Sequence, residues 1–305
     1  MLPIMKEEAG RDLRAEIQEA IEDFITNSPT ARLSFLDDYP MWKRPIVGFV
    51  DGDDPIFEQY KEAIGPDHLT PREALAKVNQ LPLDELPEQV SIVTWVLPIT
   101  EETRKSNRKE SRVPSRLWSH TRWHGEECNN ALRRLIVELL RQKGYLAAAP
   151  VVEEFYELFS GPNGLYSNWS ERHVSFAAGL GTFSLSDGFI TEQGIAHRCG
   201  SVITSAPLAS GDPQRAKHPF GNCLFYQGVH CRACILRCPV GAITVNGHDK
   251  EKCHEYFIEI GYLTEDGELK DSYDNETGVA GCGLCQTKVP CESVNPVKKR
   301  SPRDD

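Results

Sequence analysis

Cysteine is distributed very unevenly along this chain of 305 residues, and this limits the possible folds more than any other feature of the sequence. Eight of the ten cysteines lie between Cys223 and Cys291, whereas the first 222 residues contain only Cys128 and Cys199. The N-terminus lacks the basic start and apolar core of a secretory signal, so we expect the chain to stay in the cytoplasm. In that reducing compartment, a segment dense in cysteine is expected to bind metal rather than to form disulfides.

The spacing of the central cysteines follows a known ligand pattern. Cys231, Cys234 and Cys238 form the run C-x2-C-x3-C, and Pro239 follows directly. This is the central and terminal part of the bacterial ferredoxin motif, although seven residues separate it from Cys223 where that motif has two. Thiolates are soft ligands that suit iron–sulfur clusters, and eight thiolates are the number that two [4Fe-4S] clusters require.

A crossing rule divides the eight cysteines into two sets. In two-cluster ferredoxins, the cysteine before the proline binds the other cluster. The rule predicts one cluster held by Cys223, Cys231, Cys234 and Cys291. It predicts a second cluster held by Cys238, Cys253, Cys282 and Cys285.

Alternatives to this assignment remain open from the sequence. A structural zinc ion bound by Cys231, Cys234, Cys282 and Cys285 would leave four cysteines unexplained. A single cluster beside some other group is a further alternative. Cys223 has an irregular spacing, and Cys199 could replace it. Otherwise Cys128 and Cys199 are expected to be small buried residues.

The first 212 residues carry the periodicities of a layered fold of helices and strands. Apolar residues three and four positions apart predict amphipathic helices over residues 11–25, 129–143 and 170–178. Short apolar runs predict strands, with a polar linker between the first two, over residues 46–50, 90–99, 145–149 and 201–204. We therefore expect an α/β or α+β layer of about 210 residues.

A change in composition near Pro213 marks the predicted domain boundary. We expect an α/β domain over residues 1–212, a cysteine-rich domain over residues 213–298 and a charged tail over residues 299–305. The longest nearly apolar stretch, residues 90–99, is about half of what a membrane span needs. No membrane association is therefore expected.

The formal net charge of −11 bears on the class of partner. A strongly acidic chain is not expected to have a general affinity for nucleic acid or anionic lipid. The sequence therefore predicts a small molecule or another protein as the partner, with nucleic acid unlikely.

From Glu171 onward, the order of motifs resembles a known family. Glu171-Arg172 is followed by AAGLGTFSLSDGFIT (177–191), then by GSVITSAPL (200–208), and then by the cysteine array. This order resembles epoxyqueuosine reductases and reductive dehalogenases, which are cobalamin-dependent iron–sulfur enzymes, and the resemblance covers roughly residues 90–295. It implies an α+β protein with a nitroreductase-like α/β domain that holds a base-off corrinoid, and a C-terminal two-cluster ferredoxin-like domain. It also implies that the isolated Cys253 serves the second cluster.

The resemblance implies that the corrinoid lies against two segments that contain glycine. These segments supply the candidate contacts Gly179, Leu180, Gly181, Thr182, Phe183, Gly200 and Ser201. Glycine lets a backbone approach a large planar ring closely. The alternative for Gly179 is a plain helix C-cap, since glycine is common at helix ends.

Two stretches depart from the family pattern. The closing motif is C-x2-C-x5-C, ending at Cys291, where the family usually has C-x2-C-x3-C-P. The aspartate that epoxyqueuosine reductases place shortly before the Glu-Arg pair is missing, and its position falls at Leu165, beside Tyr166. Because dehalogenases of this kind use a tyrosine as the proton donor, the resemblance implies a catalytic role for Tyr166. Glu171 and His173 are further candidates for proton transfer, and queuosine chemistry on tRNA is not expected.

A second polar and aromatic group lies earlier in the chain, at Arg122, Trp123 and His124. Trp118 and Trp123 are expected to be packing residues rather than platforms on which a ligand stacks.

These features together predict an iron–sulfur oxidoreductase. Two [4Fe-4S] clusters would pass low-potential electrons from a reduced ferredoxin or flavodoxin-type donor to a cobalamin, or to a small-molecule substrate, in the N-terminal domain. One alternative is a corrinoid-free electron-transfer protein or reductive activator that serves a partner enzyme. Another is a non-redox protein whose clusters only hold the fold together.

Overall fold

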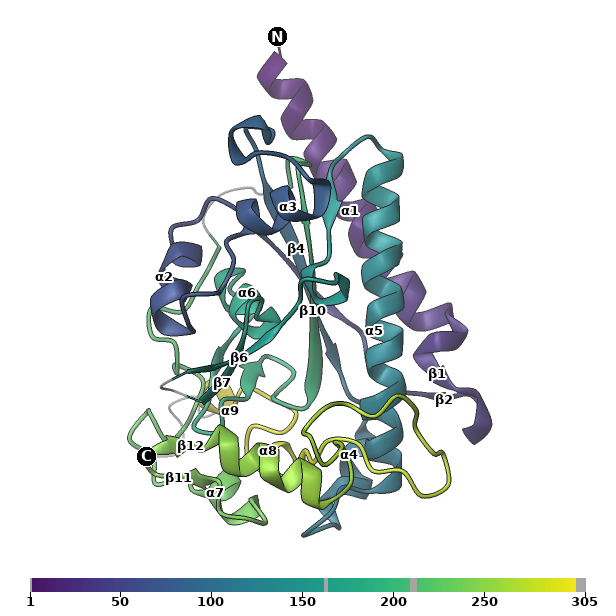
Figure 1. The fold of residues 1–305 in the computed structure, drawn as a ribbon, viewed down its shortest axis with the longest axis vertical. Coiled ribbons are helices and arrows are strands. Elements are labelled where there is room, and N and C mark those ends of the chain that lie inside the picture. Colours follow the sequence, from purple (N-terminus) through teal and green to yellow (C-terminus); the bar gives the residue numbers. More distant parts are fainter. Residues whose placement is uncertain (1, 162–163, 209–212, 300–305) are drawn as a thin grey trace.

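The main sheet of the protein has four strands and is entirely antiparallel. A computed structural model describes residues 2–161, 164–208 and 213–299 (Figure 1). The strands, in their spatial order, are β3 (Ile46–Asp51), β4 (Ser91–Pro98), β10 (His197–Thr204) and β5 (Ala147–Ala148). An antiparallel sheet covered by helices belongs to the α+β class, so the mixed fold predicted from the sequence is confirmed in this form.

The central strand β4 is buried along its whole length. All eight of its residues are buried, which explains why its sequence is an almost continuous apolar run. Its side chains alternate between two cores: Val93, Trp95 and Leu97 pack on one face of the sheet, whereas Ile92 packs on the other. The sheet is therefore the middle layer of three.

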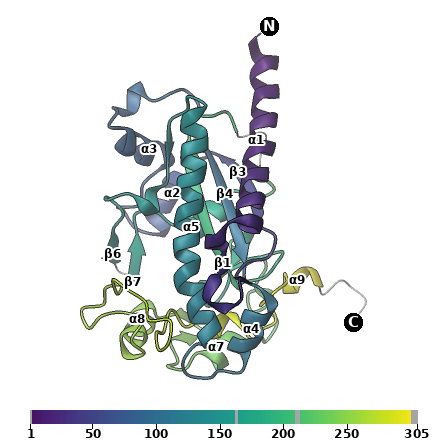
Figure 2. The ribbon, with the colours of Figure 1, turned by 90° about the vertical axis from the view of Figure 1, so that its right-hand side faces the viewer.

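Helices form the two outer layers (Figures 1 and 2). One face is covered by α1 (Leu2–Asn27) and α5 (Arg116–Gln142). The other face is covered by α2 (Ile56–Ala63), α3 (Pro71–Asn79) and α6 (Glu171–Ala177). In Figure 1, α1 and α5 lie to the right of the sheet, and α2, α3 and α6 lie to its left.

Two expectations from the sequence are wrong in this region. The segment between the first two strands is not a linker, because it forms α2 and α3. Both helices are short, so their apolar residues do not repeat often enough to reveal a helical period. The helix expected over residues 129–143 begins at Arg116, where the Ser115 hydroxyl accepts a hydrogen bond from the Trp118 N–H at 3.2 Å. Gly125 interrupts its apolar pattern because a Cβ there would overlap the Trp42 ring.

The remaining elements are short. Two-stranded antiparallel hairpins are formed by β1 (Arg32–Leu33) with β2 (Tyr39–Pro40), β6 (Leu158–Gly161) with β7 (Gly164–Ser167), β8 (Gly181–Phe183) with β9 (Phe189–Thr191), and β11 (Ile243–Thr244) with β12 (Gly247–His248). The other helices are α4 (Glu101–Arg108), α7 (Ala233–Arg237), α8 (Lys250–Glu259) and α9 (Pro296–Lys299). Turns of 3₁₀ helix occur at Pro29–Ala31, Ser34–Leu36, Leu83–Glu85, Pro150–Val152 and Leu284–Gln286, the last of which is η5.

The cysteine-rich segment lies at one end of the sheet, beside α4 and the first turns of α5 (Figure 1). Residues 209–212, next to the predicted domain boundary, and residues 300–305 of the predicted tail lie outside the described part of the chain. No helix in the described part of the chain is both long and apolar enough to cross a membrane.

Candidate metal centres

Four of the cysteines line one pocket at the end of the sheet. The pocket encloses about 360 Å³, partly open to solvent, and its lining includes Cys223, Cys231, Cys234 and Cys291. Burial, and then the neighbouring sulfurs of Cys223 and Cys231, raise the pKa of the Cys234 thiol to about 11. Burial also raises the pKa of Cys291, and the sulfurs of the other three cysteines add to that rise. We refer to these four residues as the first cysteine group.

The other four cysteines of the array form a second group, which consists of Cys238, Cys253, Cys282 and Cys285. Burial, and then the sulfurs of Cys282 and Cys238, raise the pKa of the Cys253 thiol to about 12. Burial raises the pKa of Cys285 well above its usual value, and the next contributions come from Cys282 and Cys253. Cys238 is the member that leaves its sequence neighbours, and its sulfur accepts a hydrogen bond from the Ala242 N–H at 3.2 Å.

The two groups adjoin each other. Cys234 of the first group also raises the pKa of Cys285 of the second. Members of both groups pack against one small apolar cluster, formed by Leu185, Ile190, Ile195, Cys223, Ile243 and Val289. Burial raises the pKa of five of these thiols, so metal binding at them must release protons. The five are Cys234, Cys253, Cys282, Cys285 and Cys291.

Four thiols in each group are the number that one [4Fe-4S] cluster or one structural zinc ion requires. In the described part of the chain, no three His, Cys, Asp or Glu side chains converge closely enough to hold one metal ion. A [4Fe-4S] cluster binds each cysteine through a different iron, so its four sulfurs stand further apart than the ligands of a single zinc ion. The zinc alternative also pairs Cys231 and Cys234 with Cys282 and Cys285, which lie in different groups.

Cys199 lies apart from both groups. It belongs to β10, and its sulfur is 3.6 Å from His197 Nδ1. Burial raises its pKa to about 12, and Ser175 and Glu171 are the next groups that act on it. Cys128 is buried in α5. Cys223, and not Cys199, is thus the residue that accompanies Cys231.

Arg237 ties the two cysteine-bearing turns to the sheet domain. It ends α7, and its guanidinium donates to the carbonyl oxygens of Leu284 at 3.1 Å and Thr287 at 3.0 Å. The same guanidinium donates to the carbonyl oxygens of Asn107 at 3.2 Å and Glu110 at 2.7 Å, at the end of α4. One side chain therefore fixes α7, η5 and α4 relative to one another.

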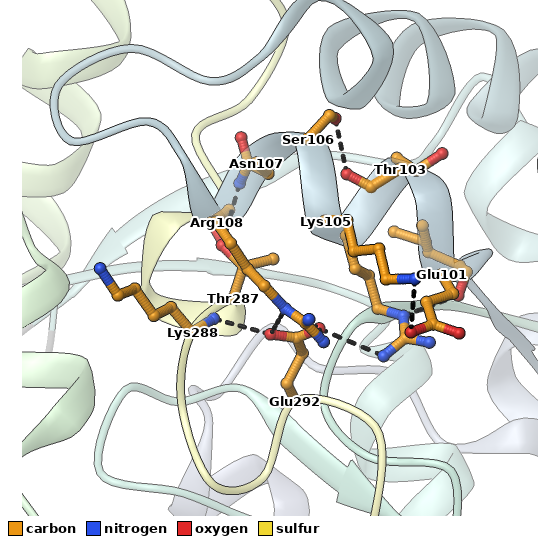
Figure 3. A network of polar contacts seen from close by, with 12 residues as sticks. Glu101, Thr103, Lys105, Ser106, Asn107, Arg108, Thr287, Lys288 and Glu292 are labelled. Atoms are coloured by element: carbon orange, nitrogen blue, oxygen red, sulfur yellow. Dashed lines mark hydrogen bonds and ion pairs between the residues drawn. The ribbon is translucent and has the colours of Figure 1, made fainter.

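Glu292 anchors the end of the cysteine array to α4 (Figure 3). Its carboxylate accepts hydrogen bonds from Arg108, the shortest at 2.6 Å, from Arg104 at 3.2 Å and from the Lys288 N–H at 2.7 Å. The side chains of Arg104 and Glu292 are only 7% and 5% exposed. Because Glu292 follows Cys291 directly, this buried ion-pair network fixes the position of a first-group cysteine.

The backbone around Cys291 also pairs with the sheet domain. The Ile195 N–H donates to the Cys291 carbonyl oxygen at 2.9 Å, and the Ala196 N–H donates to that of Glu292 at 3.3 Å. The first cysteine group is thus built partly on the segment that leads into β10.

The three candidate catalytic residues do not form one constellation in the described part of the chain. Tyr166, on β7, donates its hydroxyl to Asp67 at 2.5 Å, and this hydrogen bond raises the pKa of Tyr166. Glu171 points instead toward α5, where its carboxylate lies 3.1 Å from a guanidinium nitrogen of Arg133. Burial raises the pKa of Glu171, against the opposing effect of Arg133.

His173 lies in a mostly aromatic environment. Its Nδ1 is 2.7 Å from the Ser170 hydroxyl, and its ring contacts the rings of Tyr60 and Phe183. Burial holds its pKa well below the usual value, so the imidazole is neutral near pH 7.

Two residues close to Tyr166 and His173 were not identified from the sequence. Asp67 and His68 lie in the loop between α2 and α3, and no motif marks them. The buried His68 accepts a hydrogen bond from the Ser170 N–H at 3.3 Å and stacks on Trp169. Asp67 is 99 positions from Tyr166 in sequence, so only the fold brings the two together.

The glycines expected to contact a corrinoid have packing roles. Gly179 ends α6 with a φ of +75°; its N–H donates to the Phe176 carbonyl oxygen, and the Leu180 N–H donates to that of Ser175. This is the Schellman motif, so the C-cap alternative explains Gly179. A Cβ on Gly181 would overlap the Ile190 carbonyl group.

The other candidate contacts are also engaged within the protein. Phe183 belongs to the core, and the Thr182 hydroxyl accepts a hydrogen bond from the Asn222 N–H at 2.7 Å. A Cβ on Gly200 would overlap Trp95, and the Ser201 hydroxyl accepts from the Trp169 indole at 3.1 Å. Six of the seven positions, all except Leu180, thus have packing or hydrogen-bonding roles within the protein, while Gly179, Leu180 and Gly181 stay partly exposed.

The second polar and aromatic group supports the cysteine-rich segment. Trp123 stacks on Tyr273, with 5.3 Å between ring centroids. His124 Nε2 lies 2.9 Å from the Asn275 side chain, and Arg122 contacts Gly281. Trp118 is buried in the core, as expected.

Known proteins resemble this chain over part of its length. No protein-family profile matches it. The epoxyqueuosine reductase of Leadbetterella byssophila is 34% identical over 122 residues, which cover 38% of this chain and 35% of that protein. The epoxyqueuosine reductase of Staphylococcus aureus is 31% identical over 127 residues, which cover 40% of this chain and 29% of that protein.

Part of the chain is thus similar in sequence to curated epoxyqueuosine reductases, in agreement with the resemblance seen in its motifs. The match spans only about a third of the length of these curated relatives. Their activity is therefore not transferred directly to this chain.

Solved structures give weaker likenesses. A catabolic reductive dehalogenase aligns with 84% of this chain and 31% of its own, at 16% identity and a TM-score of 0.47. An epoxyqueuosine reductase with a modified tRNA stem loop aligns with 90% of this chain and 66% of its own, at 17% identity and a TM-score of 0.42. TM-scores below 0.5 do not establish a shared fold.

The net charge of this chain led us to regard nucleic acid as an unlikely partner. Net charge describes the whole surface and not the region around a site, so this expectation stays a prediction.

Proposed function

We propose that this chain is an iron–sulfur oxidoreductase that carries two [4Fe-4S] clusters. The carrying observation is that eight thiols gather into two adjoining groups of four that interleave in the sequence. Cys238 follows Cys234 in the motif, yet it lies with Cys253, Cys282 and Cys285. Two-cluster ferredoxins have the same arrangement, in which the cysteine before the proline belongs to the other cluster. A site for a single metal ion would not explain why Cys238 lies with the second group.

Under this proposal the chain has two functional parts. Residues 213–298 form a ferredoxin-like domain, and residues 1–212 form a nitroreductase-like domain that holds the electron acceptor. The contacts of Arg237 and Glu292 with α4 support a fixed path between the two parts. Adjoining clusters suit the transfer of single low-potential electrons from a reduced ferredoxin or flavodoxin-type donor.

The acceptor proposed from the family is a cobalamin, whose cobalt would supply low-potential reduction of a small-molecule substrate. The residues proposed to contact it are Gly179, Leu180, Gly181, Thr182, Phe183, Gly200 and Ser201. Six of these positions are engaged in packing or hydrogen bonds within the protein, and these contacts would have to change for a ring to lie against them. We therefore derive no reaction step through it.

Proton delivery would fall to Tyr166. Its hydroxyl is partly exposed and already donates to Asp67, so the pair can release a proton from the tyrosine and recover one through the carboxylate. His173 stays neutral near pH 7 and holds the Ser170 hydroxyl. Glu171 is paired with Arg133 and serves the structure of α6 rather than proton transfer.

The internal contacts of the corrinoid positions favour a second candidate function. A corrinoid-free electron-transfer protein or reductive activator would keep both clusters and pass electrons to a partner enzyme. In that case the packed glycines are simply part of the fold, as the Schellman motif at Gly179 indicates.

Metal analysis after anaerobic purification distinguishes these functions. The protein is reconstituted with iron and sulfide, incubated with cobalamin, desalted, and assayed for iron, sulfide and cobalt. Two clusters require about eight iron and eight sulfide per chain. One cobalt per chain supports the corrinoid-dependent reductase, and no cobalt supports the electron-transfer protein. Zinc without sulfide would refute both.

A further inference from the structure

The indole N–H of Trp118 has no hydrogen-bond partner within the described residues, although it is buried. Trp118 is only 3% exposed, so water does not satisfy this group. An indole nitrogen is a donor only, and a buried donor without an acceptor is costly and rare in folded proteins. An acceptor that the polypeptide itself does not supply would remove this cost.

The indole lies directly against the turn that carries two cysteines of the second group. Gly283 sits between Cys282 and Cys285 and begins η5 with a φ of +63°. A Cβ on Gly283 would overlap Trp118 at its Nε1, Cε2 and Cζ2 atoms. The nitrogen-bearing edge of the ring therefore covers the Cys282–Cys285 turn, and only glycine leaves room for it.

The neighbouring polar contacts of this turn are already in use. The Asn107 side chain donates to the Cys282 carbonyl oxygen at 3.4 Å, and Arg237 occupies the carbonyl oxygens of Leu284 and Thr287. The turn that the indole covers carries the sulfurs of Cys282 and Cys285, two members of the second cysteine group. Sulfur accepts hydrogen bonds more strongly when it is a metal-bound thiolate or a sulfide, because it then carries negative charge.

We infer that Trp118 donates its indole N–H to a sulfur of the cluster held by Cys238, Cys253, Cys282 and Cys285. This inference rests on the proposed function, since it requires that cluster. Trp118 is then a positioning residue that also tunes the cluster, because a donor to cluster sulfur favours the reduced, more negative form. Its removal lowers the reduction potential of the second cluster and leaves that of the first unchanged.

The test is a redox titration of Trp118→Phe, followed by EPR under anaerobic conditions. Phenylalanine keeps an aromatic ring against Gly283 and removes the donor. We expect the ratio of reduced to oxidised second cluster at a fixed potential to fall roughly threefold, or about 30 mV for a one-electron couple. The matched control is Trp42→Phe, because that indole is also buried and lies against a glycine, Gly125, but its cysteine neighbour is Cys128 and not a member of either cysteine group.

A second measurement needs no stable variant. In wild-type protein with ¹⁵N-labelled tryptophan, pulsed EPR of the reduced clusters should detect one coupled indole nitrogen. The inference is overturned if no nitrogen couples to the cluster. It is also overturned if the second cluster of Trp118→Phe has the same reduction potential as that of the wild type and of the control Trp42→Phe. A wild type that holds no iron and sulfide would instead refute the proposed function itself.

Discussion

Replacing Glu292 by glutamine tests how firmly the cysteine array is attached to the rest of the protein. Glutamine keeps the size of the side chain and one acceptor oxygen, but it removes the negative charge that faces Arg104 and Arg108. Figure 3 shows the contact of Glu292 with Arg108. The two arginines respond differently. The Arg108 side chain is 37% exposed and can turn toward water, whereas the Arg104 side chain is buried and cannot.

The expected cost follows from that difference. Removing one partner of a buried ion pair leaves an uncompensated charge and destabilises a protein by about 3–5 kcal/mol. Because glutamine still accepts one hydrogen bond and Arg108 can regain hydration, we expect the lower end, about 3 kcal/mol. A domain is stable by only about 5–15 kcal/mol, so the change should be large.

Urea denaturation of the cluster-loaded protein under anaerobic conditions measures this loss, with tryptophan fluorescence and cluster absorbance as the signals. Glu101→Gln is the matched control, since Glu101 pairs with Lys105 at 3.1 Å on an exposed helix face, and its midpoint should not move. The double variant Arg104→Met/Glu292→Leu should recover most of the lost stability, because it leaves no buried charge unpaired. A loss below about 1 kcal/mol for Glu292→Gln would show that the network behaves as a surface pair and that this reasoning is wrong.

Three further changes address the metal centres and the candidate proton site. Cys253→Ala should remove or convert one cluster and spare the other, whereas Cys199→Ala should leave iron and sulfide content unchanged; equal content in both variants would contradict the assignment. Asp67→Asn should lower the pKa of Tyr166, because the hydrogen bond to Asp67 raises it, and ultraviolet titration against Tyr166→Phe detects the shift. Burial lowers the pKa of His68 to about 4. Between this pKa and the usual value, His68 is therefore protonated in the unfolded chain and neutral in the folded protein. His68 alone should therefore contribute a loss of stability of up to about 1.4 kcal/mol per pH unit from pH 6.5 toward pH 4. The lowered pKa values of His120, His173 and His197 act in the same direction, and His68→Gln should reduce the slope of urea midpoints against pH.

The cysteine groups could be anticipated from the sequence because cluster ligation depends on local spacing. A C-x2-C turn and the cysteine before proline are fixed by short-range geometry, so the interleaved sets could be written down before any fold was known. The main strands and three of the covering helices were also predictable, since β4 is continuously apolar and α1, α5 and α6 carry a helical period.

The contacts that hold the array in place were not predictable. Helix α4 has the sequence EETRKSNR, which is typical of a solvent-exposed helix, yet Thr103, Arg104 and Asn107 are buried. Arg104 meets Glu292 across 188 positions of sequence, and no periodicity reveals which arginine has a distant partner. Asp67 escaped notice for the same reason, because its significance depends on Tyr166.

The pairing of Ile195 and Ala196 with the segment at Cys291 sets an order for biosynthesis. All four strands of the main sheet are complete once the ribosome has passed Thr204, so this part can fold before the last cysteines emerge. Neither cysteine group, by contrast, is complete until residues 285 and 291 have left the exit tunnel. The sheet of the nascent chain can thus form first, and the final segment completes both cysteine groups late in synthesis.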